Sequence, residues 1–126
     1  MTTPVGPYSP IMKGGNFLFT AGQIGIKDGA LVEGGVEAQT RQVFANLRAL
    51  LASADATLKD VLKVTVFLTD INDYAKVNRI YAQEFAEAGD VAGQLPARSA
   101  VAVVALPLGA AVEIEVVATD PLSRES

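Results

Sequence analysis

The chain has 126 residues, a formal net charge of −4, 50% hydrophobic residues, and neither cysteine nor histidine. These absences exclude thiol nucleophiles, disulfides, Cys/His zinc sites and Ser-His-Asp triads from this chain. The ten lysines and arginines are dispersed, whereas a nucleic-acid-binding protein normally presents a basic face, so we expect no nucleic-acid partner. Any acid–base chemistry must therefore use carboxylates, tyrosine, lysine, backbone groups or water.

Length and hydropathy predict one domain over residues 1–126 that associates with itself. A chain of this size can bury a real core, and its positive mean hydropathy suggests apolar surface that another copy covers. An alanine- and valine-rich monomer is the alternative. The sequence shows no signal-peptide pattern, and its longest nearly apolar run, 100–112, is too short to cross a bilayer. We expect a cytoplasmic protein with no membrane partner.

The first part of the chain predicts two strands and a glycine-marked stop. Residues 8–12 favour a short edge strand, because Pro10 lacks a backbone donor. Residues 17–21 favour a second strand by their bulky side chains. Gly22 and Gly25 end it, which indicates either a close approach of the backbone to another group or a simple β-bulge.

Two amphipathic helices with a strand between them follow. Apolar residues recur at helical spacing over 36–54, and residues 62–69 alternate as a strand expects, with Leu62 and Val64 on one face. Asp70 or Asn72 can cap the second helix, which Gly89 would end. The stripe of this helix, interpreted as core, comprises Tyr74, Val77, Tyr81, Phe85 and Ala88.

The last two apolar runs, 95–104 and 112–118, are joined by a turn at 106–109 and predict a hairpin. In that hairpin Val103 would lie opposite Glu113, and Arg98 opposite Ala118. The two helices would cover one face of a single sheet, and the other face would stay apolar, from valine and alanine. The expected fold is therefore α+β with a mixed sheet.

Arg98 and two carboxylates are the candidate chemical groups. A guanidinium beside apolar surface needs an anion, which is either a substrate carboxylate, bound by a bidentate fork, or a structural partner such as Glu113 or Glu115. These two carboxylates share one strand face. Each is either a general acid–base group with a raised pKa or part of a solvated face.

Arg98 and Glu113 are too far apart on the predicted hairpin to meet on one small molecule. Five residues separate their levels, which is about 16 Å at the usual rise of a strand. If both act on one substrate, they come from two chains.

The chain resembles the Rid family (also known as the YjgF family), the reactive-intermediate imine deaminases. The resemblance covers nearly the whole length, and the order and spacing of seven segments make it specific. These segments are Gly6-Pro7-Tyr8, Thr20-Ala21-Gly22-Gln23-Ile24, Ala38-Gln39-Thr40-Arg41-Gln42, Val64-Thr65-Val66-Phe67-Leu68-Thr69-Asp70, Val77-Asn78-Arg79-Ile80-Tyr81, Pro96-Ala97-Arg98-Ser99 and Val112-Glu113-Ile114-Glu115.

The resemblance implies a chorismate-mutase-like α+β fold and a homotrimer with a cleft between each pair of subunits. It implies hydrolysis of short-lived enamines and imines, such as 2-aminoacrylate and 2-iminopropanoate, to 2-oxoacids and ammonia, with no cofactor and no metal. By position, Arg98 would grip the substrate carboxylate and Glu113 would hold or activate water. The residues that would line the cleft are Tyr8, Gly22, Ile24, Asn78 and Ala100.

The chain departs from the archetype of the family at three positions. Ala21 stands where many members have serine, Ala100 where the archetype has cysteine, and Ala102 where it has an acid. The resemblance therefore implies a less polar and roomier cleft. Two other functions stay open: a trimer that binds small carboxylates without turnover, and an endoribonuclease, against which the acidic charge and the missing histidine argue.

Overall fold

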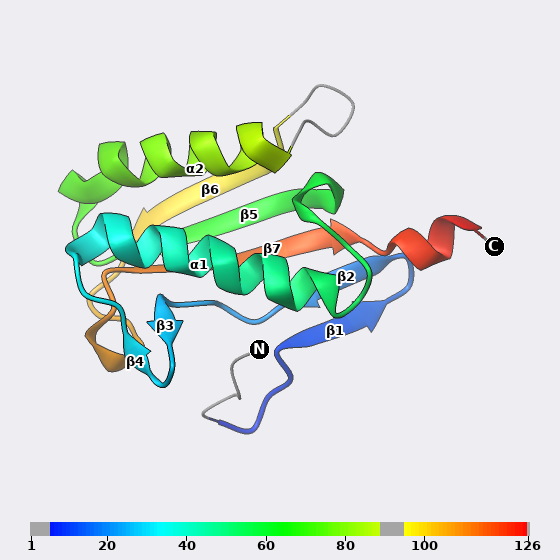
Figure 1. The fold of residues 1–126 in the computed structure, drawn as a ribbon, viewed down its shortest axis with the longest axis horizontal. Helices are drawn as coiled ribbons and strands as arrows, with labels where there is room; N and C mark the ends of the chain where they lie inside the picture. Colours follow the sequence, from blue (N-terminus) through cyan, green and yellow to red (C-terminus); the bar gives the residue numbers. More distant parts are fainter. Residues whose placement is uncertain (1–5, 89–94, 126) are drawn as a thin grey trace.

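The computed structural model describes residues 6–88 and 95–125 and contains a five-stranded mixed sheet with two long helices on one of its faces (Figure 1). The strands of this sheet are β1 (Ile11–Gly14), β2 (Phe17–Thr20), β5 (Val61–Leu68), β6 (Ala97–Ala102) and β7 (Val112–Thr119). The other elements are a small hairpin of β3 (Ile26–Lys27) and β4 (Ala30–Leu31), the helices α1 (Gly35–Ala52) and α2 (Tyr74–Ala88), and the short 3-10 turns η1 (Leu58–Asp60), η2 (Ile71–Asp73), η3 (Pro107–Gly109) and η4 (Pro121–Glu125).

The predicted hairpin of the last two strands is wrong, because β5 lies between them. The strand order is β1-β2-β7-β5-β6, with β6 parallel and β7 antiparallel to β5. Arg98 is therefore level with Val64 of β5, and Glu113 with Phe67. A parallel pair needs a crossover connection, and α2 supplies it between β5 and β6. The turn at 106–109 was correctly placed but carries the chain past β5 rather than straight back.

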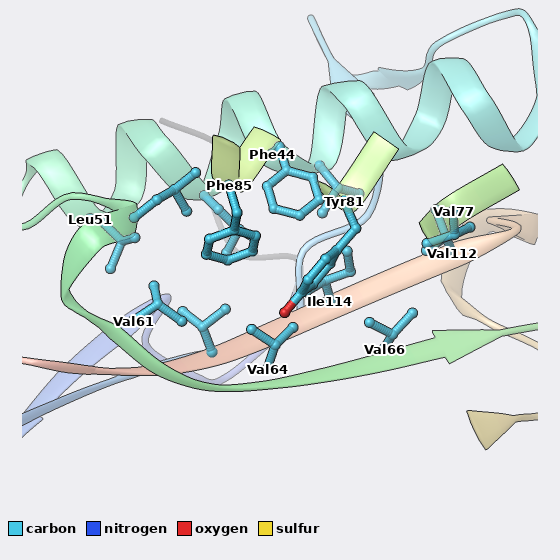
Figure 2. Packing of buried hydrophobic residues seen from close by; sticks show 14 of the residues in the cluster. Phe44, Leu51, Val61, Val64, Val66, Val77, Tyr81, Phe85, Val112 and Ile114 are labelled. Carbon is cyan, nitrogen blue, oxygen red and sulfur yellow. The ribbon is translucent and has the colours of Figure 1, made fainter. Parts of the chain in front are cut away.

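The core lies between the helices and the face of the sheet that they cover. Phe44 of α1 meets Tyr81 and Phe85 of α2 edge-on, with ring centroids 5.9 and 5.8 Å apart, an arrangement that aromatic quadrupoles favour. Figure 2 shows these rings above Val64 and Ile114 of the sheet. Burying each such large side chain stabilises the fold by about 1.5–3 kcal/mol. Neither helix, within the described part of the chain, is long and apolar enough to cross a membrane.

Four local predictions differ from the structure. Leu62 is 40% exposed, because a register shift between Val61 and Lys63 turns Val61 inward instead. The edge strand begins at Ile11, after Pro10. Asp70 accepts a hydrogen bond from the Asn72 N–H and so caps η2 rather than α2. Tyr74, expected in the core, is 40% exposed. Gly89, the expected helix stop, lies outside the described residues.

The face of the sheet opposite the helices, here called the open face, is apolar but aromatic rather than rich in alanine. Strand alternation and register place its apolar side chains together: Met12, Phe17, Phe19, Phe67, Val101 and Val117. Phe17 and Phe19 are 41% and 46% exposed. An exposed apolar patch of this kind marks an interaction surface.

Candidate active site

Glu113 projects from β7 onto the open face, next to Phe67 of β5. Its side chain is half-buried, and no hydrogen bond or ion pair to it exists among the described residues. Burial raises the pKa of the Glu113 carboxyl, and the neighbouring charge of Glu115 raises it further. A carboxyl group with a raised pKa and free oxygens is suited to hold a water molecule and exchange a proton with it.

Gly22 packs directly against this carboxylate. The chain leaves β2 and pairs once more with β7, where the Gln23 N–H donates to the Ile114 carbonyl at 2.8 Å and the Ile114 N–H donates back at 3.0 Å. A Cβ atom on Gly22 would lie 2.5 Å from Oε2 of Glu113, so any side chain at this position would force the glutamate to shift. Of the two explanations for this glycine pair, the close approach of backbone to another group is the correct one at Gly22.

The segment after Gly22 is held in place by α1. The Asn46 side-chain amide donates to the carbonyls of Ile24 and Ile26 at 3.1 and 3.0 Å, and it accepts a bond from Gln42. The structure thus brings together three of the expected site residues: Gly22, Ile24 and Glu113.

Arg98 lies on the other face of the sheet, beneath α2. Its Cζ is 4.7 Å from the centroid of the Tyr81 ring and 5.5 Å from that of Tyr74, and its Nη2 donates a hydrogen bond of 2.9 Å to the Tyr74 hydroxyl. Among the described residues no carboxylate lies within ion-pair distance of this guanidinium. A structural salt bridge from Arg98 to Glu113 or Glu115 within the chain is therefore excluded.

Two more expected residues lie on the side of Arg98. Ala100 follows it on the same face of β6. Asn78 lies one helical turn after Tyr74 on α2, so both start from the same side of that helix. Tyr8, in contrast, precedes β1, which lies at the opposite edge of the sheet from β6. These two edge strands are four strand spacings apart, which is about 19 Å.

The expected site therefore divides into two groups that one chain does not join. Arg98 and Glu113 project from opposite faces, with β5 between their strands. Their backbone positions differ by about 10 Å across the strands and by about 10 Å along them. The prediction that the two residues do not meet within one chain agrees with this arrangement. The predicted separation of five residues along a hairpin is wrong, because their levels differ by three residues and β5 lies between their strands. No cluster of three potential metal ligands exists among the described residues.

Sequence reasoning missed the two tyrosines that surround Arg98. Tyr74 and Tyr81 are seven residues apart on α2, a spacing that puts both on one side of a helix. This spacing predicts a core stripe, which is right for Tyr81, 5% exposed, and wrong for Tyr74. Only the placement of β6 under α2 shows that the stripe also faces the arginine.

Comparison with known proteins identifies the family of this chain. Residues 1–120 match the family model described as Endoribonuclease L-PSP. The chain belongs to this family, known as the Rid or YjgF family. The expected fold is confirmed to the extent that solved members share the mixed sheet with two helices.

Three relatives show how close this Rid-family chain is to known members. A RutC family protein of Pyrococcus horikoshii is 50% identical over 91% of the chain and 88% of its own length. The mouse 2-iminobutanoate/2-iminopropanoate deaminase is 40% identical, over 90% of this chain and 82% of its own. The crystal structure of E. coli TdcF with bound serine is 36% identical, with a TM-score of 0.85, and the match covers 92% of this chain and 90% of that one.

Proposed function

We propose that this Rid-family protein hydrolyses reactive 2-imino acids and their enamine tautomers to 2-oxoacids and ammonia. The observation that carries the proposal is the guanidinium of Arg98, which no carboxylate of the described chain neutralises. An arginine fork of this kind binds a carboxylate bidentately. The mouse relative, named as a deaminase of 2-iminobutanoate and 2-iminopropanoate, supports the substrate class.

The proposed reaction needs only positioning and one acid–base group. Arg98 holds the carboxylate of the imino acid. Glu113 accepts a proton from a bound water as the water oxygen attacks the imine carbon, which gives a carbinolamine. The proton then passes from Glu113 to the amino nitrogen. As the C–N bond breaks, the carbinolamine hydroxyl gives its own proton to Glu113 and becomes the carbonyl, and ammonia leaves with the 2-oxoacid. The raised pKa of Glu113, caused by burial and by the charge of Glu115, favours both transfers, because a carboxyl that is a weaker acid accepts and retains the proton more readily.

The proposal includes a homotrimer whose sites lie between subunits. Arg98 and Glu113 lie on opposite faces of one chain, so a site that uses both takes Arg98, Ala100 and Asn78 from one subunit. The second subunit supplies Glu113, Gly22 and Ile24, and Tyr8 reaches the same cleft. The open face, with exposed Phe17 and Phe19, provides apolar surface for this association.

The test generates imines in situ and follows their hydrolysis. An amino acid oxidase with catalase converts amino acids to imines, and 2-oxoacid release is measured with and without the protein. The proposal predicts faster release that Arg98→Ala abolishes. If the protein binds 2-oxobutyrate but accelerates the hydrolysis of no imine, the deaminase proposal is wrong and the protein is a trimer that binds small carboxylates without turnover.

RNA cleavage belongs in the same experiment, because the description of the matching family model names an endoribonuclease. The net charge of −4 opposes binding of a polyanion. We therefore expect no cleavage of single-stranded RNA above that of the Arg98→Ala protein.

A further inference from the structure

The guanidinium of Arg98 is held by two tyrosines that use different parts of their side chains. Tyr74 and Tyr81 are separated by about 10 Å along α2, yet both reach the same group. Tyr81 offers only its ring, 4.7 Å from Cζ. Tyr74 offers its hydroxyl, which accepts the 2.9 Å hydrogen bond from Nη2.

The Tyr81 hydroxyl takes no part in this arrangement. It points away from α2 toward Val64 of the sheet (Figure 2), and it has no hydrogen-bond partner in the described chain. Burial raises the pKa of this hydroxyl to about 12, although the charge of Arg98 opposes the shift. Tyr81 is thus a neutral core residue whose ring forms a floor for the arginine.

Tyr74 differs because the core does not need it. Its side chain is 40% exposed, and a phenylalanine would fill the same space. The alanines that follow Arg98 on its face of β6, Ala100 and Ala102, carry no group that could hold the guanidinium from the strand side. The Tyr74 hydroxyl is therefore the one polar group of the described chain with a hydrogen bond to Arg98.

We propose that Tyr74 is a positioning residue for the carboxylate-binding arginine. Its hydroxyl uses one of the five guanidinium N–H groups and fixes the plane of the fork above the Tyr81 ring. The remaining N–H groups then point to the substrate carboxylate before it arrives, so that less side-chain freedom is lost on binding. Because the hydroxyl is uncharged, the full positive charge stays available. This inference rests on the proposed role of Arg98.

The test is Tyr74→Phe, which removes the hydroxyl and keeps the ring. We expect the Kd for 2-oxobutyrate and the KM for the imine to rise together by about five- to twentyfold, with kcat within about twofold of the wild type. The matched variant is Tyr81→Phe, which removes a hydroxyl without a partner. It should change the Kd by less than about twofold and leave the melting temperature equal or higher.

A double-mutant cycle separates this inference from the proposed function. In an Arg98→Ala protein, Tyr74→Phe should have no further effect on binding, because the group that it positions is gone. An unchanged Kd in Tyr74→Phe, or an equal rise of the Kd in Tyr81→Phe, would overturn the positioning role of Tyr74. The proposed deaminase activity would still stand in that case if turnover depends on Arg98. A lowered melting temperature with kcat and KM both impaired would make Tyr74 structural. A wild-type protein that neither binds 2-oxobutyrate nor accelerates hydrolysis would remove both proposals.

Discussion

Glu113 is the residue at which the proposed chemistry is most directly testable. Glu113→Gln keeps the size of the side chain but removes its ability to accept a proton. Turnover should fall by about 10²–10⁴-fold, the usual loss for a positioned general base, whereas the Kd for 2-oxobutyrate should stay near that of the wild type. Imine turnover and calorimetric titration measure the two quantities. Unchanged turnover would mean that Glu113 does not activate the water and that Glu115 is the next candidate.

The same variant has a predicted effect on stability. The pKa of Glu113 is raised in the folded protein, so the folded state disfavours the charged form, and above the folded pKa this costs stability. The cost disappears as the pH falls through that pKa and below the unfolded value. Glu113→Gln should therefore melt at an equal or higher temperature than the wild type at pH 7, and the difference should vanish near pH 3.

Gly22 provides a second residue-scale prediction, because its missing side chain makes room for Glu113. Gly22→Ala places a Cβ 2.5 Å from Oε2. The far end of a glutamate is flexible and can move aside, so we expect turnover to fall at least tenfold with little change in melting temperature. Gly25→Ala is the contrasting variant, because its Cβ would meet backbone atoms of Gln39 at 2.8 Å and should destabilise the fold. Full activity in Gly22→Ala would show that the position of Glu113 is not critical.

Substitution of Arg98 tests whether carboxylate binding needs only a positive charge or also the geometry of the guanidinium. Arg98→Lys keeps the positive charge but replaces two parallel N–H donors with one rotating ammonium. We expect it to resemble Arg98→Ala, with 2-oxobutyrate binding and imine turnover both reduced at least tenfold, and with nearly unchanged melting temperature and oligomeric state. A lysine variant that binds like the wild type would contradict the bidentate role. Loss of the oligomer in both variants would make the arginine structural.

At the scale of elements, α1 shapes the water site through one side chain. Asn46 donates to the carbonyls of Ile24 and Ile26. Asn46→Ala removes both bonds, although the Ile24 carbonyl keeps the bond from the Ile26 N–H, and each lost hydrogen bond costs about 0.5–1.5 kcal/mol. The melting temperature should fall, and turnover should fall more than 2-oxobutyrate binding, because the segment beside Glu113 is loosened. Gln42→Ala, which removes only the neighbouring bond to Asn46, should have a smaller effect on both.

Element periodicity predicted the two helices and most strands, because 3.6- and 2-residue patterns follow from which face is buried. It failed for the pairing of β6 with β7, because two apolar runs around a turn look the same whether they pair or a third strand separates them. It also failed at Leu62, where one extra residue reverses the alternation.

The candidate site was predictable in part. The resemblance supplied Gly22 and Glu113, which the structure places in contact. The tyrosines beside Arg98 depend on the packing of α2 over β6, which no local pattern encodes.

At the scale of the whole molecule, complementation between inactive variants tests the shared site. Arg98→Ala and Glu113→Gln chains, unfolded together in equal amounts and refolded, should form mixed oligomers in which some sites combine an intact arginine with an intact glutamate. Random assembly makes about a quarter of the sites complete, so activity should return to about a quarter of the wild-type value. Each variant refolded alone is the control. Light scattering should give a trimer, and no recovery from a mixed trimer would mean that both residues act within one chain.

The central position of β7 also constrains the order in which the protein can fold. This strand pairs with β2 on one side and β5 on the other, and Phe17 lies opposite Thr119 across a sequence separation of about a hundred residues. During synthesis the hairpin of β1 and β2 therefore has no sheet to join until residues 112–119 have emerged. Until then the edge of β2 and the edge of β5 that β7 pairs with both lack their partner strand, and β7 joins the two ends of the chain when it is added.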